Sequence, residues 1–332
     1  MKKERKIKER KGGGLMRLGT LVCVTGLCLM LPVTPVSAEG IGSDTYFASE
    51  TAGYAQPRGT VTEASARAAK IEYDLPGVSN KSVGAHERLT TTVNGRAVSD
   101  PSLVMNGIAY VPLRAAANAL GISGVSYNSQ TRTMTVSQGG LYLSVTDGGF
   151  VVYANDRPLF NFSPSVVMSN GRMYIPASTF AKATGTSFTR SGSTLSLTGS
   201  FKPLIKAQSY YREDEVFWLA RIIAAEAKGE SLLGQIAVGD VILNRVKSNQ
   251  FPNTIYSVIF DKKYGVQFSP STNGTIYNTP TYTATLAAKI CLEGTSLSDN
   301  AMYFINPIKA PNSWVSKARE YAYTIGNHDF YL

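Results

Sequence analysis

The chain has 332 residues, enough for two or three domains, and a formal net charge of +10 at pH 7. Residues 1–38 contain eight Lys/Arg and two Glu, so they carry +6 of that charge and leave only +4 for the rest of the chain. This mild excess is compatible with an anionic polymer as partner. We expect no nucleic-acid partner, because residues 39–332 show no cluster of Lys and Arg interleaved with aromatic residues.

Residues 1–38 are typical of a secretory signal peptide. A basic stretch ends at Arg17, an apolar stretch covers residues 18–31, and Val36-Ser37-Ala38 places small residues before a cleavage point. We therefore expect cleavage after Ala38 and a secreted protein. An uncleaved membrane anchor is the alternative, although the apolar stretch is short for a span of about 20 residues.

Cysteine and histidine are scarce in the rest of the chain. Cys23 and Cys28 lie in the signal segment, so Cys291 remains alone and no internal disulfide is expected. The two histidines, His86 and His328, lie in different regions. We therefore predict no zinc site and no cofactor.

Residues 39–88 are rich in Ser, Thr, Ala and Gly and show no sustained periodicity, which predicts a linker with a short helix around residues 62–71. An internal repeat follows, because the pattern of residues 104–112 returns 64 residues later in residues 168–176. The residues that keep register are Asn106/Asn170, Gly107/Gly171, Tyr110/Tyr174, Pro112/Pro176 and Gly121/Gly185.

Each unit of the repeat predicts the same order of elements. An Asn-Gly pair predicts a hairpin between two strands, and the Pro that follows begins a helix over residues 113–120 or 177–184, which a Gly ends. An alternating strand then covers residues 133–136 or 194–197. Two such strand-strand-helix-strand units predict a small α+β domain over residues 89–198.

This region resembles the copper amine oxidase N-terminal-like stalk domains of secreted bacterial proteins. The resemblance rests on Val93-Asn94-Gly95, on Asn106-Gly107 with Tyr110-Val111-Pro112-Leu113-Arg114, and on Asn170-Gly171-Arg172 with Tyr174-Ile175-Pro176. The second copy departs after Pro176, where Ala177-Ser178 replace Leu-Arg. No metal is implied, because the region contains neither Cys nor His. The resemblance implies a binding or spacer module, with a wall component or a protein as ligand.

Residues 199–212 contain Gly199, Ser200 and Pro203 and predict a second linker before the C-terminal domain, residues 213–332. Glu213-Asp214-Glu215 place negative charge at the positive end of the next helix, predicted over residues 217–230. Further helices are predicted over residues 232–247, 255–260 and 281–293, and the remainder is predicted to be rich in loops.

The first of these helices places a carboxylate on its apolar face. Leu219, Ile222 and Ile223 share that face, and Glu226 is the next residue on it. Burial of a carboxylate raises its pKa, and a carboxylic acid that keeps its proton near neutral pH can serve as a general acid. The alternative is a buried Glu that pairs with an Arg or a backbone donor for structural reasons.

The C-terminal domain resembles the cell wall hydrolases of the SleB/CwlJ type, the spore cortex-lytic enzymes. The motifs, in order along the chain, are Ala220-Arg221-Ile222-Ile223-Ala224-Ala225-Glu226-Ala227-Lys228-Gly229-Glu230, Gly234-Gln235, Asn244-Arg245-Val246, Phe251-Pro252, Gln267-Phe268-Ser269-Pro270, Tyr303-Phe304 with Asn306-Pro307, and Ile325-Gly326-Asn327-His328. The resemblance implies a mostly α, lysozyme- or transglycosylase-like fold and peptidoglycan as substrate. It also implies cleavage of the MurNAc–GlcNAc strand, with Glu226 as the catalytic acid, in the cell wall or spore envelope.

A lytic transglycosylase needs no second carboxylate, whereas a conventional hydrolase does. Glu230 is the candidate for that second carboxylate if the helix continues, but Gly229 is expected to end it, which leaves helix capping as the other role. The resemblance also implies that Gln267, Ser269, Asn306 and His328 line the sugar groove, although each could instead hold a loop in place.

Two other classes of protein remain as alternatives. A cysteine amidase acting on the wall peptide would use Cys291 and His328, but Cys291 lies near the C-terminal end of its predicted helix, where the dipole opposes a thiolate. A non-catalytic wall-binding protein would carry Glu226 as an ordinary buried acid. The sequence leaves open whether the substrate is cortex or vegetative wall, whether the product is anhydro or hydrolytic, how the enzyme is activated, and the oligomeric state.

Overall fold

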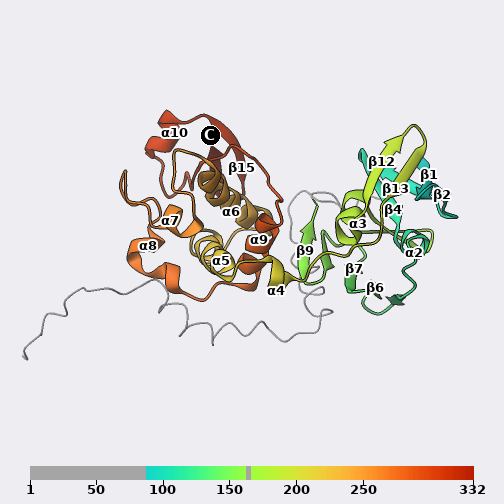
Figure 1. Ribbon diagram of the computed structural model, residues 1–332. Coiled ribbons are helices and arrows are strands. Elements are labelled where there is room, and N and C mark those ends of the chain that lie inside the picture. The colour runs from blue at the N-terminus through green and yellow to red at the C-terminus, as the bar shows by residue number, and fades with distance from the viewer. Residues whose placement is uncertain (1–86, 162–165) are drawn as a thin grey trace, which may run out of the picture. The chain divides into compact units, whose positions relative to one another are not determined.

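The structure, a computed structural model, describes residues 87–161 and 166–332. The predicted signal peptide, residues 39–86 of the predicted linker and its helix around residues 62–71 lie outside the described residues. The described chain consists of a strand-rich segment up to residue 198 and a helical C-terminal segment (Figure 1). No helix in either described range has both the length and the apolar character needed to cross a membrane.

The strand-rich segment begins at Glu87, so the last two residues of the predicted linker belong to a strand. Its elements are β1 (Glu87–Val93), β2 (Arg96–Ala97), β3 (Ser102–Met105), β4 (Ile108–Pro112), α2 (Leu113–Ala119), β5 (Val125–Asn128), β6 (Thr133–Gln138), β7 (Leu141–Thr146), β8 (Val151–Ala154), β9 (Arg157–Phe160), β10 (Val167–Ser169), β11 (Arg172–Pro176), α3 (Ala177–Thr184), β12 (Ser187–Ser191) and β13 (Thr194–Thr198).

These strands form two sheets. An eight-stranded sheet has the order β10-β11-β4-β3-β1-β13-β12, with β2 paired to β1, and a five-stranded antiparallel sheet runs in sequence order from β5 to β9. Successive side chains of a strand point to opposite faces of the sheet, and in β1 the side chains of Leu89, Thr91 and Val93 are buried on one face while their neighbours are more exposed. Most of the buried apolar residues of both sheets and of helices α2 and α3 share one core.

Both predicted Asn-Gly hairpins form. Asn106 and Gly107 have φ of 50° and 79°, and Asn170 and Gly171 have φ of 49° and 72°. Two successive positive φ values are what a type I′ turn requires, which explains the Asn-Gly pair. The turns join β3 to β4 and β10 to β11.

The predicted order of strand-strand-helix-strand is wrong after the helix, because in the described residues five strands, β5 to β9, follow α2 and two strands, β12 and β13, follow α3. Strand β5 lies between α2 and the predicted strand β6, and β12 lies between α3 and the predicted strand β13. Both extra strands are mostly exposed and lack an alternating apolar pattern. Pairing with β6 and β13 creates them, and the local sequence does not signal such pairing.

The helical segment contains α4 (Ala207–Tyr210), α5 (Glu213–Ala227), α6 (Leu232–Lys247), α7 (Ile255–Ile259), α8 (Pro270–Asn273), a 3-10 turn η2 (Thr275–Tyr277) and α9 (Tyr282–Leu292). Helix α5 begins with the three predicted acidic residues and ends before Gly229. Helix α6 begins where the side chain of Ser231 accepts a hydrogen bond from the backbone N–H of Gly234, an N-cap.

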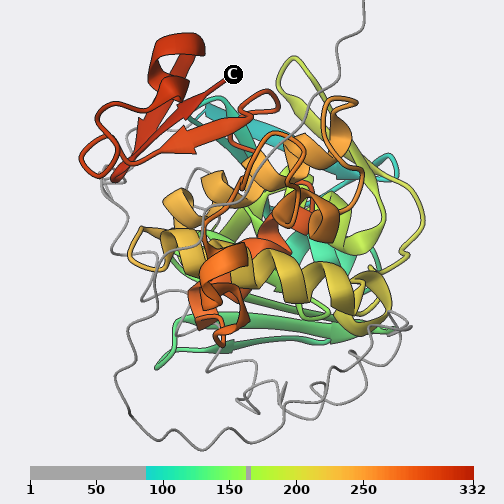
Figure 2. The ribbon, with the colours of Figure 1, turned by 90° about the vertical axis from the view of Figure 1, so that its left-hand side faces the viewer.

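The C-terminal remainder, predicted to be rich in loops, also contains a sheet that was not predicted. Strands β14 (Tyr303–Ile305), β15 (Tyr321–Ile325) and β16 (His328–Tyr331) form a three-stranded antiparallel sheet in the order β14-β16-β15, and α10 (Trp314–Ala318) lies between β14 and β15 in sequence. Figure 2 shows these red strands side by side. The strands are three to five residues long, too short for periodicity to reveal them.

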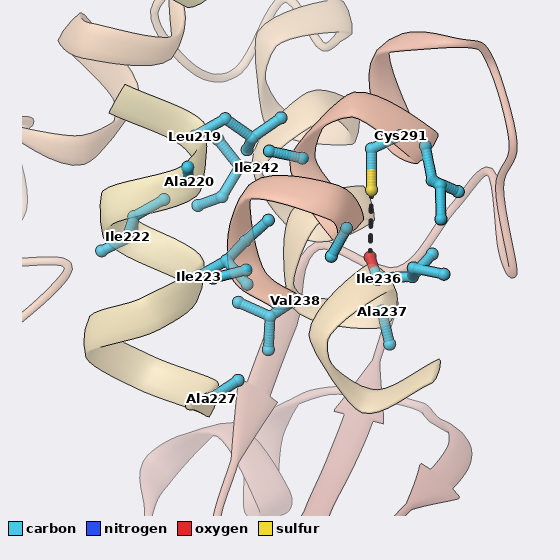
Figure 3. Close-up of a cluster of buried hydrophobic side chains, with 14 of the residues drawn as sticks. Leu219, Ala220, Ile222, Ile223, Ala227, Ile236, Ala237, Val238, Ile242 and Cys291 are labelled. Atoms are coloured by element: carbon cyan, nitrogen blue, oxygen red, sulfur yellow. Dashed lines mark hydrogen bonds between the residues drawn. The ribbon is translucent and has the colours of Figure 1, made fainter. Parts of the chain in front are cut away.

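Helices α5, α6 and α9 pack against one another and form the core of the helical segment. Leu219, Ile222 and Ile223 of α5 are fully buried, as predicted from their spacing. Ile236 and Val238 of α6 belong to the same buried cluster, and Figure 3 shows Ile223 pointing toward Val238. Each such side chain contributes about 1.5–3 kcal/mol when it is removed from water, so this packing fixes the position of α5.

The helical core also includes apolar residues from strands β8 and β9, among them Val151 and Phe160. Beside it, Arg157 of β9 donates two hydrogen bonds to the carboxylate of Glu293, of 2.7 and 2.9 Å. Tyr211 and Lys182 contact the same carboxylate. Residues 199–212, predicted as a linker, therefore include the short helix α4 and a side chain held in this cluster.

We predict that Gly239→Ala destabilises the protein although it lies inside helix α6. A Cβ at this position would lie 2.7 Å from Sγ of Cys291 and 3.0 Å from Cδ1 of Ile223, so the helices must move apart. The expected loss is about 1–2 kcal/mol in the free energy of unfolding, because overpacking outweighs the better helix propensity of Ala. Urea unfolding measures it, with Gly229→Ala, whose Cβ would meet open space, as control. A stabilised Gly239→Ala variant would contradict the packing described here.

Candidate active site

Glu226 lies in the last turn of α5, one residue before the helix ends at Ala227. The side chain is half-buried rather than fully buried, so the prediction that it faces the core holds only in part. This position leaves the side chain partly accessible to solvent, whereas Leu219, Ile222 and Ile223 on the same face are fully buried. Among the residues that the structure describes, none donates a hydrogen bond to it.

The surroundings of Glu226 favour its protonated form. Burial raises the pKa of this carboxyl group to about 7, and the nearby Lys309 opposes that shift. The C-terminal end of a helix carries a partial negative charge, which also disfavours an ionised carboxylate there, and the last turn of α5 contains no basic residue. A carboxylic acid with a pKa near 7 can donate a proton at neutral pH and later accept one.

Glu230 lies outside α5 and holds the turn between β15 and β16. Its Oε2 accepts a hydrogen bond of 3.1 Å from the backbone N–H of Asn327, and its Oε1 accepts one of 2.9 Å from Nδ2 of the same residue. Gly326 is required beside it, because a Cβ there would collide with the carboxylate and because its φ is 58°. Glu230 thus neither continues the helical face of Glu226 nor caps a helix, and its oxygens are engaged with the hairpin.

His328 begins strand β16 and is buried. Its Nδ1 lies 3.9 Å from Oε1 of Glu230 and has no hydrogen-bond partner in the described part of the chain. Burial lowers the pKa of His328, and Glu230 opposes that effect. Burial thus favours the neutral imidazole, and its ring packs edge-on against Phe304, with 5.4 Å between ring centroids.

Lys309 connects these groups electrostatically and was not predicted from the sequence. Its charge lowers the pKa of both Glu226 and His328, which places all three in one neighbourhood. Asn306 holds the turn that carries it, since Oδ1 of Asn306 accepts hydrogen bonds of 3.1 Å from the backbone N–H groups of Ile308 and Lys309. The Asn306-Pro307 pair belongs to the remainder predicted to be rich in loops, and nothing in the sequence indicated that Lys309 would lie beside Glu226.

Gln267 and Ser269 lie in the loop that leads into α8. Gln267 donates to the carbonyl of Gly265 at 3.2 Å and accepts from Nη1 of Arg245 at 3.3 Å, so it ties the loop to α6. Arg245 also donates to the carbonyl of Met302 beside strand β14. Ser269 is exposed at the start of α8. No contact between described residues joins Gln267 or Ser269 to Glu226, and their role as sugar ligands stays a prediction.

Cys291 is unsuited to nucleophilic attack. The thiol is buried, donates a hydrogen bond of 3.5 Å to the carbonyl of Ile236, and has a pKa raised well above its usual value by burial (Figure 3). Within residues 87–161 and 166–332, no group of three or more His, Cys, Asp and Glu is placed to hold a metal ion. The strand-rich segment contains no Cys or His, so its residues do not fit a copper site.

Two sequence families match this chain. The model of the cell wall hydrolase family matches residues 229–331, and that of the copper amine oxidase N-terminal domain family matches residues 92–198. The helical segment therefore carries a cell wall hydrolase domain, and the strand-rich segment carries a copper amine oxidase N-terminal domain. Both predicted resemblances are confirmed. Glu226 precedes the matched range, so its role is not carried by that match.

Several relatives are described as spore cortex-lytic enzymes. One from Bacillus cereus is 38% identical over 120 residues, which cover 36% of this chain and 45% of the relative. One from Bacillus subtilis is 35% identical over 120 residues, covering 36% and 38%. The solved catalytic domain of the germination-specific lytic transglycosylase SleB from Bacillus anthracis is 38% identical, with 37% of this chain and 97% of that one covered and a TM-score of 0.34. The chain spans less than half the length of the curated relatives it matches.

We predict that Gly326→Ala loosens the β15–β16 hairpin. The added Cβ would displace the Glu230 carboxylate in addition to straining a positive φ. Gly274→Ala is the matched control, because Gly274 also has a positive φ, of 81°, but open space around it. The control should lose about 1–2 kcal/mol from backbone strain alone, whereas Gly326→Ala should lose more and should show faster hydrogen exchange in residues 321–331. Equal losses with unchanged exchange would mean that Glu230 does not hold this turn.

Proposed function

We propose that this protein cleaves the MurNAc–GlcNAc glycan strand of peptidoglycan, with Glu226 as the catalytic acid. The observation that carries the proposal is a solvent-accessible carboxyl group with a pKa of about 7 at the end of α5. The cell wall hydrolase domain and relatives described as spore cortex-lytic enzymes support the same substrate.

In the proposed reaction, protonated Glu226 donates its proton to the glycosidic oxygen while the bond breaks through an oxocarbenium-like state. The resulting carboxylate then takes the proton of the sugar's own 6-hydroxyl as that oxygen attacks the anomeric carbon. The ring closes to a 1,6-anhydro sugar, Glu226 regains its proton, and no water is consumed. Lys309 would stabilise the Glu226 carboxylate between the two proton transfers.

The hydrogen bonds that Glu230 accepts support the transglycosylase reaction over hydrolysis. A hydrolase needs a second carboxylate as base or nucleophile, and Glu230 was the candidate for that role. Two hydrogen bonds from Asn327 and the proximity of His328 occupy its oxygens. We infer that Glu230, Asn306 and His328 shape the loops around Glu226, and that Gln267 and Ser269 bind sugar farther along the groove.

We also propose that the strand-rich segment consists of two copies of one unit. Strands β4 and β11 carry the repeated motif and pair antiparallel, with Tyr110 opposite Pro176 and Pro112 opposite Tyr174. Since Tyr110 corresponds to Tyr174 and Pro112 to Pro176 in the repeat, this register is the one that a local two-fold axis between the copies would produce. In a secreted protein, such a domain would serve as a module that binds the wall.

We predict that Glu226→Gln abolishes turnover while the fold is kept. The amide is similar in size but cannot donate the proton, and loss of general acid catalysis costs about 100-fold to 10,000-fold in rate. Muropeptides released from sacculi and from spore cortex, analysed by mass spectrometry, provide the measurement. Glu213→Gln, an exposed position in the first turn of the same helix, is the control and should keep full activity.

The products separate the alternatives. Glycan products that end in anhydro-MurNAc support the transglycosylase. Products with reducing ends would instead indicate hydrolysis, with Glu230 as the candidate base. Binding to sacculi without any release, equal in wild type and Glu226→Gln, would favour the non-catalytic wall-binding protein.

We predict that kcat falls as pH rises through about 7. The active form carries a protonated Glu226, and its pKa of about 7 means that half of the molecules have lost this proton near neutrality. His328 does not account for this fall in kcat, because burial lowers its pKa and favours the neutral imidazole before Glu226 loses its proton. Rates on sacculi between pH 5 and 9 measure the profile, with unfolding curves at each pH to confirm that the fold persists. A flat profile across this range would exclude Glu226 as the general acid.

A further inference from the structure

A pocket of about 370 Å³ lies in the strand-rich segment, far in sequence from Glu226. Helix α2, strands β5 and β6 and the β10–β11 hairpin contribute its lining. Its apolar part consists of Met134, Met168 and Met173, with the exposed ring of Tyr127 at its edge. The volume is in the range of small-molecule and peptide side-chain sites.

The pocket carries one positive charge that no acidic residue balances. Arg172 and Asp100 both line it, but they neutralise each other through an ion pair of 2.6 Å. The guanidinium of Arg114 donates one hydrogen bond, of 3.1 Å from Nη1 to the carbonyl of Val125. No other described residue pairs with it. Since an Arg side chain has five N–H donors, most of those of Arg114 remain available to a ligand.

The repeat shows that this charge is specific to the first copy. Arg114 follows the repeated Pro112 at an offset that matches Ser178 after Pro176 in the second copy. Each residue is the second in its helix and is exposed, so the backbone position is the same in α2 and α3. The guanidinium is therefore a feature of the pocket and is not required to build the unit.

We propose that this pocket binds the free carboxylate of a peptidoglycan stem peptide. An Arg guanidinium matches a carboxylate through two parallel hydrogen bonds, and the Met side chains offer an adaptable apolar surface to the methyl groups of alanine residues. The sugars of the glycan strand offer mainly amides and hydroxyls, whereas the stem peptides supply both carboxylates and methyl groups. The choice of this ligand rests on the proposed function, since it assumes that the protein meets peptidoglycan.

Binding of a soluble stem peptide to the purified protein tests this proposal. The probe is L-Ala-γ-D-Glu-L-Lys-D-Ala-D-Ala, titrated by calorimetry against its fully amidated analogue. The free acid should bind, and the amidated peptide should bind at least about tenfold more weakly, as expected when a charge-assisted hydrogen bond is lost. Affinity should also fall as the salt concentration rises.

Three variants locate the site. Arg114→Ala should lose at least about tenfold in affinity, and Arg114→Lys should lose less, because it keeps the charge without the planar fork. Arg96→Ala removes the same charge from exposed strand β2 of the same segment, away from the pocket lining, and should bind within about twofold of wild type. Thermal unfolding of each variant confirms that the fold is kept.

Unchanged affinity in Arg114→Ala, or equal binding of the acid and amidated peptides, would overturn the proposal. Binding of a glycerol phosphate polymer at this site in place of the peptide would overturn it as well. These outcomes are independent of the proposed function, because the peptide contains no glycosidic bond. A protein that releases glycan fragments but does not bind the peptide refutes only the pocket, and one that binds the peptide but releases nothing refutes only the enzyme.

Discussion

The burial of one face of α5 against α6 and α9 is the constraint on which the candidate site depends. Leu219, Ile222 and Ile223 are removed from water together, and the absence of a side chain at Gly239 lets α6 approach them closely. Because protein interiors are close-packed, α5 cannot rotate about its axis without opening cavities between the helices. Glu226 is therefore held where the apolar face ends and solvent begins. Burial at this position raises the pKa of the Glu226 carboxyl group.

The two acidic residues of the first motif have separate tasks, although only four positions divide them. Glu226 belongs to helix α5, and its burial there raises the pKa of its carboxyl group, which favours the protonated form. Glu230 lies beyond the end of the helix and connects the α5–α6 junction to the C-terminal hairpin through Asn327. Glu230, four positions after the proposed catalytic acid, thus holds the turn between β15 and β16.

The strand-rich segment is not only a spacer before the helical segment. Its β8 and β9 strands contribute side chains to the helical core, and Arg157 forms a buried ion pair with Glu293 at the end of α9. Removal of one member of such a pair leaves an uncompensated charge, which is costly. A ligand held at Arg114 would therefore be connected through ordered structure to the helices that carry Glu226.

Much of this protein could be predicted from local patterns. The 3.6-residue spacing in α5 located its buried face, and the Asn-Gly pairs at 106–107 and 170–171 predicted two hairpins. Both signals are local, because the residues that create each element are neighbours in sequence. The predicted helix over residues 232–247 coincides with α6 for the same reason.

The remaining features depend on partners distant in sequence, and only the tertiary structure decided them. Strands β5 and β12 exist because other strands pair with them, and the C-terminal sheet is assembled from strands too short to show a period. Glu230 is tied to Asn327, 97 residues away, and Lys309 acts on Glu226 through space. Glu226 itself could be selected from its helical spacing. Its half-exposed position and its pKa depend on the loops that fold against the end of α5.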